Sequence, residues 1–162
     1  MVTAVLAGAA LLVEAVRLRL PGINSLLVSR FALLLKDTES RKVTGATYVI
    51  LSALAVFLLF DKPIAVAALL FLSLGDPAAA LVGRRAPGIR FFGKSPIGTL
   101  AMALIAIGIT GVLSAAGVVD RHWGLYVGAV SAGMTELLPL PVDDNVTIPL
   151  VSGGVMTLLV GL

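Results

Sequence analysis

The sequence predicts an all-α protein, a polytopic membrane helix bundle with about six transmembrane helices and one further helix on the cytoplasmic-side interface. Of the 162 residues, 59% are hydrophobic and only 13% are charged, and the mean hydropathy is +1.08. Soluble domains carry about 25% charged residues. Apolar stretches of membrane length also recur along the chain, and the basic residues gather in alternate connections between them.

The amino-terminal part predicts one span and one surface helix. Residues 2–18 are apolar with no basic residue before them, so we expect a retained helix and not a secretory signal. Residues 21–42 carry apolar side chains at helical spacing but also Arg30 and Lys36, which disfavour a further span. This second segment predicts an amphipathic helix lying along the membrane surface.

The remaining apolar stretches each approach the roughly 17 to 25 residues that a spanning helix needs. Short polar connections separate the second from the third stretch and the fourth from the fifth. Pro96 opens the fourth stretch, where proline suits the first helical turn, and two prolines end the fifth. The five predicted spans are 43–60, 63–81, 96–119, 122–138 and 146–162.

The distribution of basic residues predicts which face carries the chemistry. All but Lys62 and Arg121 of the twelve lysines and arginines fall at the first and third connections, on the side that also holds the fifth connection. Basic connections stay in the cytoplasm, so the predicted protein is a multi-pass integral membrane protein with a cytoplasmic active site. Residues 1–162 show no linker or repeat and predict a single integral-membrane domain. Nothing in the charge pattern indicates nucleic-acid binding.

Carboxylates and an amide cluster between the fifth and sixth stretches. Glu136 ends the fifth stretch, and Asp143, Asp144 and Asn145 follow two prolines. Irregular backbone near a bilayer persists where it lines a wet cavity, and hard cations prefer oxygen ligands. The segment therefore predicts a site for Mg²⁺ or Mn²⁺ carrying nucleotide phosphates; the alternative is that the acids only cap the sixth helix. The predicted metal ligands are Asp76, Glu136, Asp143 and Asp144.

A connection that contains several basic residues and glycines precedes the fourth stretch. Lys94 and Ser95 stand where a helix begins, and free backbone N–H groups at a helix start favour phosphate. The alternative is that Lys94 only marks topology. Asp76 lies inside the membrane edge of the third stretch, where a carboxylate more often marks a site than a structural ion pair.

These motifs, in order, resemble the CTP-dependent lipid-alcohol kinases, which include dolichol kinase, phytol kinase and CTP-dependent diacylglycerol kinase. A fainter similarity reaches phosphatidate cytidylyltransferase. The resemblance spans nearly the whole chain. It rests on Glu14-x-x-Arg17, Arg30, Glu39, Thr44-Gly45, Gly75-Asp76-Pro77, Gly83-Arg84, Gly93-Lys94-Ser95, Gly98-Thr99, Glu136 and Asp143-Asp144-Asn145.

The resemblance implies a kinase that transfers the γ-phosphoryl group of CTP to the hydroxyl of a polyprenol-like or dolichol-like alcohol, phytol or diacylglycerol. Asp76, Lys94 and Asp144 are the expected catalytic residues, with Asp76 nearest the arriving hydroxyl. We expect the apolar tail to occupy a groove between helices. The expected nucleotide and phosphate contacts are Lys42, Gly83, Arg84, Lys94, Ser95, Gly98 and Asn145, and the expected supporting residues are Glu14, Arg17, Arg30, Glu39, Thr44 and Gly45.

Two other functions use the same residues. Cytidylyl transfer to phosphatidate or another lipid phosphate needs the same metal and phosphate groups. A small cation-coupled transporter is disfavoured, because the acids gather on one side and no paired repeat is present. The sequence leaves the oligomeric state open, a homo-oligomer included.

Overall fold

The computed structural model describes residues 2–20, 22, 24–25 and 43–161. Regular structure in this part of the chain is helical apart from one β-bridge between Phe91 and Lys94. The all-α prediction is therefore confirmed. The contacts group into two compact units, Met1–Leu54 and Ala55–Leu162, which are described separately. The prediction of a single domain stays a prediction.

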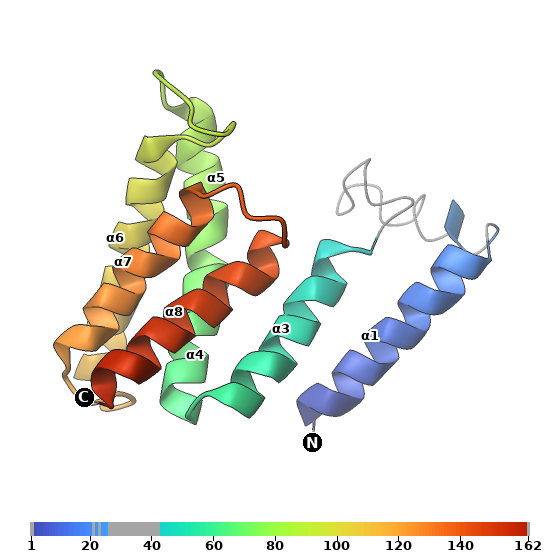
Figure 1. Cartoon of the computed structure of the whole chain (residues 1–162), viewed down its shortest axis with the longest axis horizontal. Coiled ribbons are helices and arrows are strands. Elements are labelled where there is room, and N and C mark those ends of the chain that lie inside the picture. The colour runs from blue at the N-terminus through green and yellow to red at the C-terminus, as the bar shows by residue number, and fades with distance from the viewer. Residues whose placement is uncertain (1, 21, 23, 26–42, 162) are drawn as a thin grey trace. The chain divides into compact units, whose positions relative to one another are not determined.

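The first unit contains α1 (Val2–Arg19) and most of α3 (Gly45–Leu59) (Figure 1). Both helices lie in ranges that the apolar pattern predicts. The predicted surface helix over 21–42 falls, apart from Gly22, Asn24 and Ser25, outside the described residues.

The second unit is a bundle of antiparallel neighbours, in which α5 packs on α6, α6 on α7, and α7 on α8 (Figure 1). The residues from Lys62 to Arg85 form one continuous helical rod. The elements are α4 (Lys62–Leu70), η2 (Phe71–Gly75), α5 (Asp76–Arg85), α6 (Pro96–Ala115), α7 (Trp123–Leu137) and α8 (Asp144–Val160).

In the part of the chain that the structure describes, two helices have the length and composition of a membrane span. They are Lys62–Arg85, with 24 residues, and Pro96–Ala115, with 20. Gly45–Leu59 and Asp144–Val160 are apolar but shorter, and α1 carries three charged residues near its end. Every predicted span thus contains a helix, but six membrane crossings stay a prediction.

A π-helical segment within the rod ends at Gly75, two residues before Pro77. A proline inside a helix lacks the N–H donor, and its ring collides with the carbonyl of the preceding turn. The wider turn of η2 lies over that position, so the helix continues through Pro77 to Arg85. Asp76 is the first residue after the wide turn, and such turns are frequent at functional sites.

The rod and α6 cross closely at two glycines. A Cβ on Gly98 would lie 2.7 Å from the carbonyl oxygen of Ala79 and 3.2 Å from the Cα of Gly83. A Cβ on Gly83 would meet the Cβ of Ser95 at 3.3 Å. Small residues let helix backbones approach in this way, so the crossing fixes where the loop between α5 and α6 begins and ends.

Replacing Gly98 by alanine should destabilise the bundle, because the new methyl group meets backbone that cannot move aside. We expect a loss of about 1–3 kcal/mol, which lowers the midpoint of thermal unfolding in detergent by several degrees. Gly111→Ala is the matched control, since a Cβ there meets nothing within 4 Å. Equal midpoints for the two variants would contradict the close crossing.

Candidate functional site

Lys94 and three carboxylates, Asp76, Glu136 and Asp144, meet at one end of the second unit; we call them the lysine–carboxylate cluster. They come from the loop before α6, from α5, from the end of α7 and from the start of α8. Far-apart segments of the chain therefore supply one polar region. The pocket lined by Asp61, Asp120 and Val160 lies at the opposite end.

A tight turn positions Lys94. Phe91 and Lys94 exchange two backbone hydrogen bonds of 2.9 Å, and the central residues, Phe92 and Gly93, have φ of 52° and 83°. Positive φ at both central positions is the signature of a type I′ turn. Glycine adopts this conformation freely, whereas phenylalanine does so at a cost. Strained backbone of this kind concentrates at functional sites.

The Lys94 ammonium group joins two helices. Its Nζ donates a hydrogen bond to Oδ2 of Asp144 at 2.7 Å and another to the main-chain oxygen of Glu136. Both groups of this ion pair are only partly exposed, with side-chain exposures of 26% and 35%. The lysine is therefore held at the junction of α7 and α8 with one charged partner.

Glu136 is the most enclosed carboxylate of the cluster, at 8% exposure. Thr99 Oγ1 donates to its Oε2 at 2.9 Å. The positive charge of Lys94 attracts it, and the negative charges of Asp144 and Asp76 repel it. Asp144 and Asp76 are thus near enough to act on the charge of Glu136, beside Lys94.

The carboxylates of the cluster are better suited to a metal ion bound together with nucleotide phosphates than to a metal ion held by protein side chains alone. Within the described ranges, no three acidic or histidine side chains stand close enough to hold a metal ion by themselves. Mg²⁺ rarely uses such a cage, and commonly takes one or two carboxylates together with waters and substrate phosphates. Asp144 and Glu136 are the carboxylates of the cluster that could meet that smaller requirement, and the metal site predicted at Asp76, Glu136, Asp143 and Asp144 stays a prediction.

The adjacent aspartates at the start of α8 have different contacts. Asp143 caps the helix, since its Oδ1 accepts from the backbone N–H of Asn145 at 3.0 Å and from the Asn145 amide at 2.7 Å. Asp144 is the first helical residue and pairs with Lys94. Capping and cluster formation, which the sequence posed as alternatives, are therefore both present.

Most other predicted phosphate contacts lie beside the cluster and have structural partners. Gly83 and Gly98 form the helix crossing, and Ser95 is buried against it. Arg84 is exposed, and its Nε donates to the Ala80 carbonyl one turn earlier. A phosphate role for these residues stays a prediction, although packing already explains both glycines.

Two residues of this region were absent from the predicted site. Thr99 holds Glu136, and Arg90 donates from Nη2 to the Gly83 carbonyl at 3.2 Å, tying the loop to the end of α5. A hydroxyl in the first turns of an apolar helix was the available signal for Thr99. No sequence signal separates Arg90 from the other arginines of its loop.

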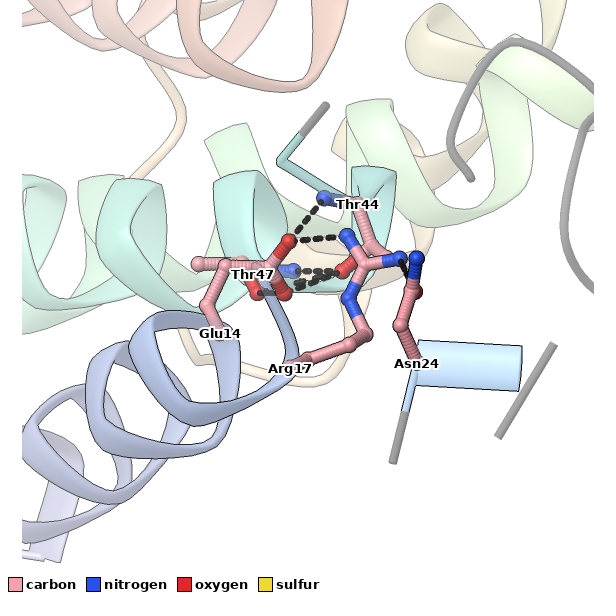
Figure 2. Close-up of polar contacts among 5 residues, drawn as sticks. All are labelled: Glu14, Arg17, Asn24, Thr44 and Thr47. Carbon is pink, nitrogen blue, oxygen red and sulfur yellow. Dashed lines mark hydrogen bonds and ion pairs between the residues drawn. The ribbon is translucent and has the colours of Figure 1, made fainter. Parts of the chain in front are cut away.

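The first unit contains its own buried polar network (Figure 2). Glu14 and Arg17 are only 5% and 3% exposed, and they form an ion pair across one turn of α1. Arg17 Nη1 also donates to Asn24 Oδ1 at 3.1 Å. A buried charge pair persists only when further hydrogen bonds satisfy it.

Those further bonds come from the start of α3. Glu14 Oε1 accepts from the Thr44 backbone N–H at 3.1 Å, and Oε2 accepts from the hydroxyls of Thr47 and Thr44 at 3.2 and 3.4 Å (Figure 2). The carboxylate thus sits at a helix N-terminus, where the dipole favours negative charge. This network joins α1 to α3, and Thr47 is a member that the predicted site omitted.

Four other predicted residues have little or no structural description. Gly45 is the first residue of α3. Arg30, Glu39 and Lys42 lie outside the described residues, so their predicted supporting and phosphate-binding roles stay predictions.

The fold and the cluster define a class: an all-helical protein in which two membrane-length helices lead to a lysine among carboxylates. Three curated plant proteins are similar to this chain. "Probable phytol kinase 3, chloroplastic" of Glycine max is 36% identical over 104 residues, or 56% of this chain. "Probable phytol kinase 2, chloroplastic" of Oryza sativa subsp. japonica is 35% identical over 104 residues, again 56%. "Probable phytol kinase, chloroplastic" of Triticum aestivum is 31% identical over 133 residues, or 72%.

The matched segments cover 33%, 34% and 44% of those three proteins, so the chain spans less than half the length of the relatives it matches. No protein-family model matches the chain. No solved structure matches it either.

The buried contacts of Glu14 predict how single and double substitutions at Glu14 and Arg17 change the free energy of unfolding. Glu14→Leu leaves a buried guanidinium without its carboxylate and should cost about 3–5 kcal/mol. Arg17→Met should cost less, because Thr44 and Thr47 still donate to Glu14. The double variant should be more stable than the sum of the single losses predicts, as measured by unfolding in mixed detergent and denaturant. Strictly additive losses would show that the two side chains do not depend on each other.

Proposed function

We propose that this chain carries the catalytic core of a CTP-dependent kinase that phosphorylates the hydroxyl of a membrane lipid alcohol at the cytoplasmic face. The observation that carries the proposal is the convergence of Lys94 with Asp76, Glu136 and Asp144 at the end of two membrane-length helices. The relatives' name, phytol kinase, supports a lipid alcohol as the acceptor. Phytol is the leading acceptor; polyprenol-like alcohols and diacylglycerol belong to the same chemical class.

The cluster has the groups that phosphoryl transfer requires. That reaction depends on positioning and on neutralising charge on the transferred group. Lys94 presents a point charge close in sequence to the start of α6, where free N–H groups favour an anion. Asp144 and Glu136, with Oδ2 of Asp143, are the oxygens we assign to Mg²⁺ or Mn²⁺. The ion, when bound with CTP, would neutralise the phosphates.

Lys94 must change partners in this scheme. It is bonded to Asp144 in the structure, and a nucleotide phosphate competes with that carboxylate for the ammonium group. Asp144 then becomes available to the metal, so a single exchange produces both a cation for the phosphates and a ligand for the ion. The Lys94–Asp144 ion pair keeps both charges partly neutralised before the nucleotide arrives.

The transfer itself breaks one bond and forms one. The lipid hydroxyl oxygen attacks the γ-phosphorus, and the bond to the β–γ bridging oxygen breaks, with its electron pair leaving on CDP. The hydroxyl proton passes to a carboxylate, and we assign this role to Asp76 because it lies within the membrane-length rod, nearest to where the lipid hydroxyl would arrive. The products are a lipid monophosphate and CDP.

Position-specific labelling separates this reaction from cytidylyl transfer. With CTP labelled at the γ-phosphate, we expect label in the lipid, and with CTP labelled at the α-phosphate we expect none. Transfer should stop with EDTA and return with excess Mg²⁺. If the lipid were labelled only from the α-phosphate and pyrophosphate were released, the protein would be a cytidylyltransferase and not a kinase. A parallel set of ATP, GTP and UTP reactions tests the choice of nucleotide.

Neutralising single carboxylates should remove turnover without unfolding the bundle. Asp144→Asn and Asp76→Asn should each lower kcat by roughly 100-fold or more, since removing a group that acts in the transition state costs on that order. Asp120→Asn is the matched control, because Asp120 is an exposed acid at the opposite end. Near-normal turnover in both cluster variants would show that the reaction takes place elsewhere. Cation flux in proteoliposomes without any CTP turnover would favour a transporter.

A further inference from the structure

Three large apolar side chains are exposed on the loop between α5 and α6. Ile89, Phe91 and Phe92 are 77%, 51% and 70% exposed, and we call them the apolar tip. Single exposed apolar residues are ordinary on a protein surface, but a cluster of them on one short loop marks a binding surface. The loop lies at the end of the rod Lys62–Arg85 (Figure 1). The partner of the apolar tip is therefore to be sought at that end of the second unit.

The backbone of Phe92 supports a role for its aromatic ring. Phe92 and Gly93 have φ of 52° and 83°, and two-residue turns of this geometry favour asparagine, aspartate or glycine at the first position. Phenylalanine adopts a positive φ only at a cost. Because a small polar residue would form the same turn more easily, the turn does not explain the phenylalanine. The use of an exposed ring at this position does.

Positively charged side chains accompany the apolar tip. Arg84 and Arg85 end α5 and are exposed, and Arg90 stands within the tip in the sequence. No acidic residue occurs between Asp76 and Asp120. The loop thus combines apolar and basic residues and has no negative charge of its own. This combination is typical of segments that lie at the surface of an anionic membrane.

Hydrogen bonds hold the loop close to the ends of the two helices that it joins. Arg90 Nη2 donates to the Gly83 carbonyl at 3.2 Å, and Gly83 lies two residues before the end of α5. Phe91 and Lys94 exchange two backbone bonds, and α6 begins at Pro96. The loop is therefore folded back, and its tip stays within the reach of an arginine side chain from the last turn of α5.

Both flanking helices have the length and composition of a membrane span. Their exposed apolar side chains next to the loop are Leu81, Val82, Ile97 and Leu100. The end of such a helix pair is the place where the chain leaves the hydrocarbon core and meets the lipid headgroups. A loop folded back at this level contacts the headgroup region, where aromatic side chains are enriched.

We propose that the loop between α5 and α6 is a membrane-surface anchor. The apolar tip inserts at the boundary between headgroups and acyl chains, and the arginines contact the phosphate groups of anionic lipids. The membrane satisfies both halves of the loop, since it supplies hydrocarbon for the rings and negative charge for the guanidinium groups. The inference is independent of the proposed function, because it requires only the loop and the bilayer.

The first experiment measures how deeply the tip lies in the bilayer. Trp123→Phe removes the only tryptophan of the chain, so that Phe92→Trp in that background reports on the turn alone. In vesicles of equal parts phosphatidylcholine and phosphatidylserine, its fluorescence should fall by roughly half when the lipid chains are brominated near the headgroup. Acrylamide, which stays in water, should quench it little. Strong quenching by acrylamide, with no effect of the brominated lipids, overturns the proposal.

The second experiment tests the charged part of the anchor. In the same background, phosphatidylserine should increase the quenching by brominated lipids over that in phosphatidylcholine alone. Arg85→Gln should cancel much of this increase, since one basic residue near an anionic surface changes binding roughly fivefold. Arg121→Gln is the matched control, because Arg121 is an exposed arginine in the connection between α6 and α7. Equal quenching in the two lipid mixtures, or equal effects of the two substitutions, overturns the proposal.

The third experiment separates the ring of Phe92 from its backbone. The reporter is Phe91→Trp, again with Trp123→Phe, and Phe92→Asn is added to it. Asparagine suits a positive φ, so the midpoint of thermal unfolding should not fall, whereas quenching by brominated lipids should decrease. Unchanged quenching overturns the proposal.

Two other partners of the apolar tip would give different results. Protection of the tryptophan from acrylamide without quenching by brominated lipids would assign the tip to a protein contact. A change of its fluorescence only on addition of CTP would assign the tip to the nucleotide base. Either result overturns the membrane anchor, and neither depends on whether the protein phosphorylates a lipid.

Discussion

The contact of Gly83 with Gly98 is the constraint from which the arrangement of the second unit follows. Because neither residue has a Cβ, α5 and α6 approach until backbone meets backbone. The loop between them must then reverse within a short space, and it does so through the turn at Phe92 and Gly93 that presents Lys94. Farther from this contact, α4 and α6 are less closely packed, and an apolar groove lined by Leu70, Leu74 and Leu104 lies between the rod and α6.

The proposed phosphoryl transfer to a lipid alcohol combines a polar step with an apolar substrate. Transferring a phosphoryl group requires charge neutralisation in a partly enclosed site, whereas holding a hydrocarbon chain requires the absence of polar groups. The rod Lys62–Arg85 carries both kinds of surface, with Asp76 at the cluster and with Leu70 and Leu74 in an apolar groove. Leu74 belongs to the wide turn of η2, and Asp76 is the first residue after it.

In the sequence, several glycines and acidic residues had more than one possible role. The packing of the helices shows which structural role each of them has. A glycine near a lysine predicts phosphate binding, but the close helix crossing already explains why Gly83 and Gly98 are glycines. Two adjacent aspartates predict either a cap or a charged site, and Asp143 and Asp144 provide one of each. Glu14 and Arg17 likewise form a buried link from α1 to α3, a role that their i, i+3 spacing alone could not reveal.

The sequence by itself determined where the helices of the described residues lie, because apolar length, helix-starting prolines and turn-forming glycines act over a few neighbouring residues. It also identified Asp76, Lys94, Glu136 and Asp144 as polar groups that need partners near a bilayer. Only the tertiary structure decided which partners they have. Lys94 and Asp144 are 50 positions apart, and Thr99 and Glu136 are 37 apart. Such pairs form only after α6, α7 and α8 pack, since no local pattern specifies which faces of those helices will meet.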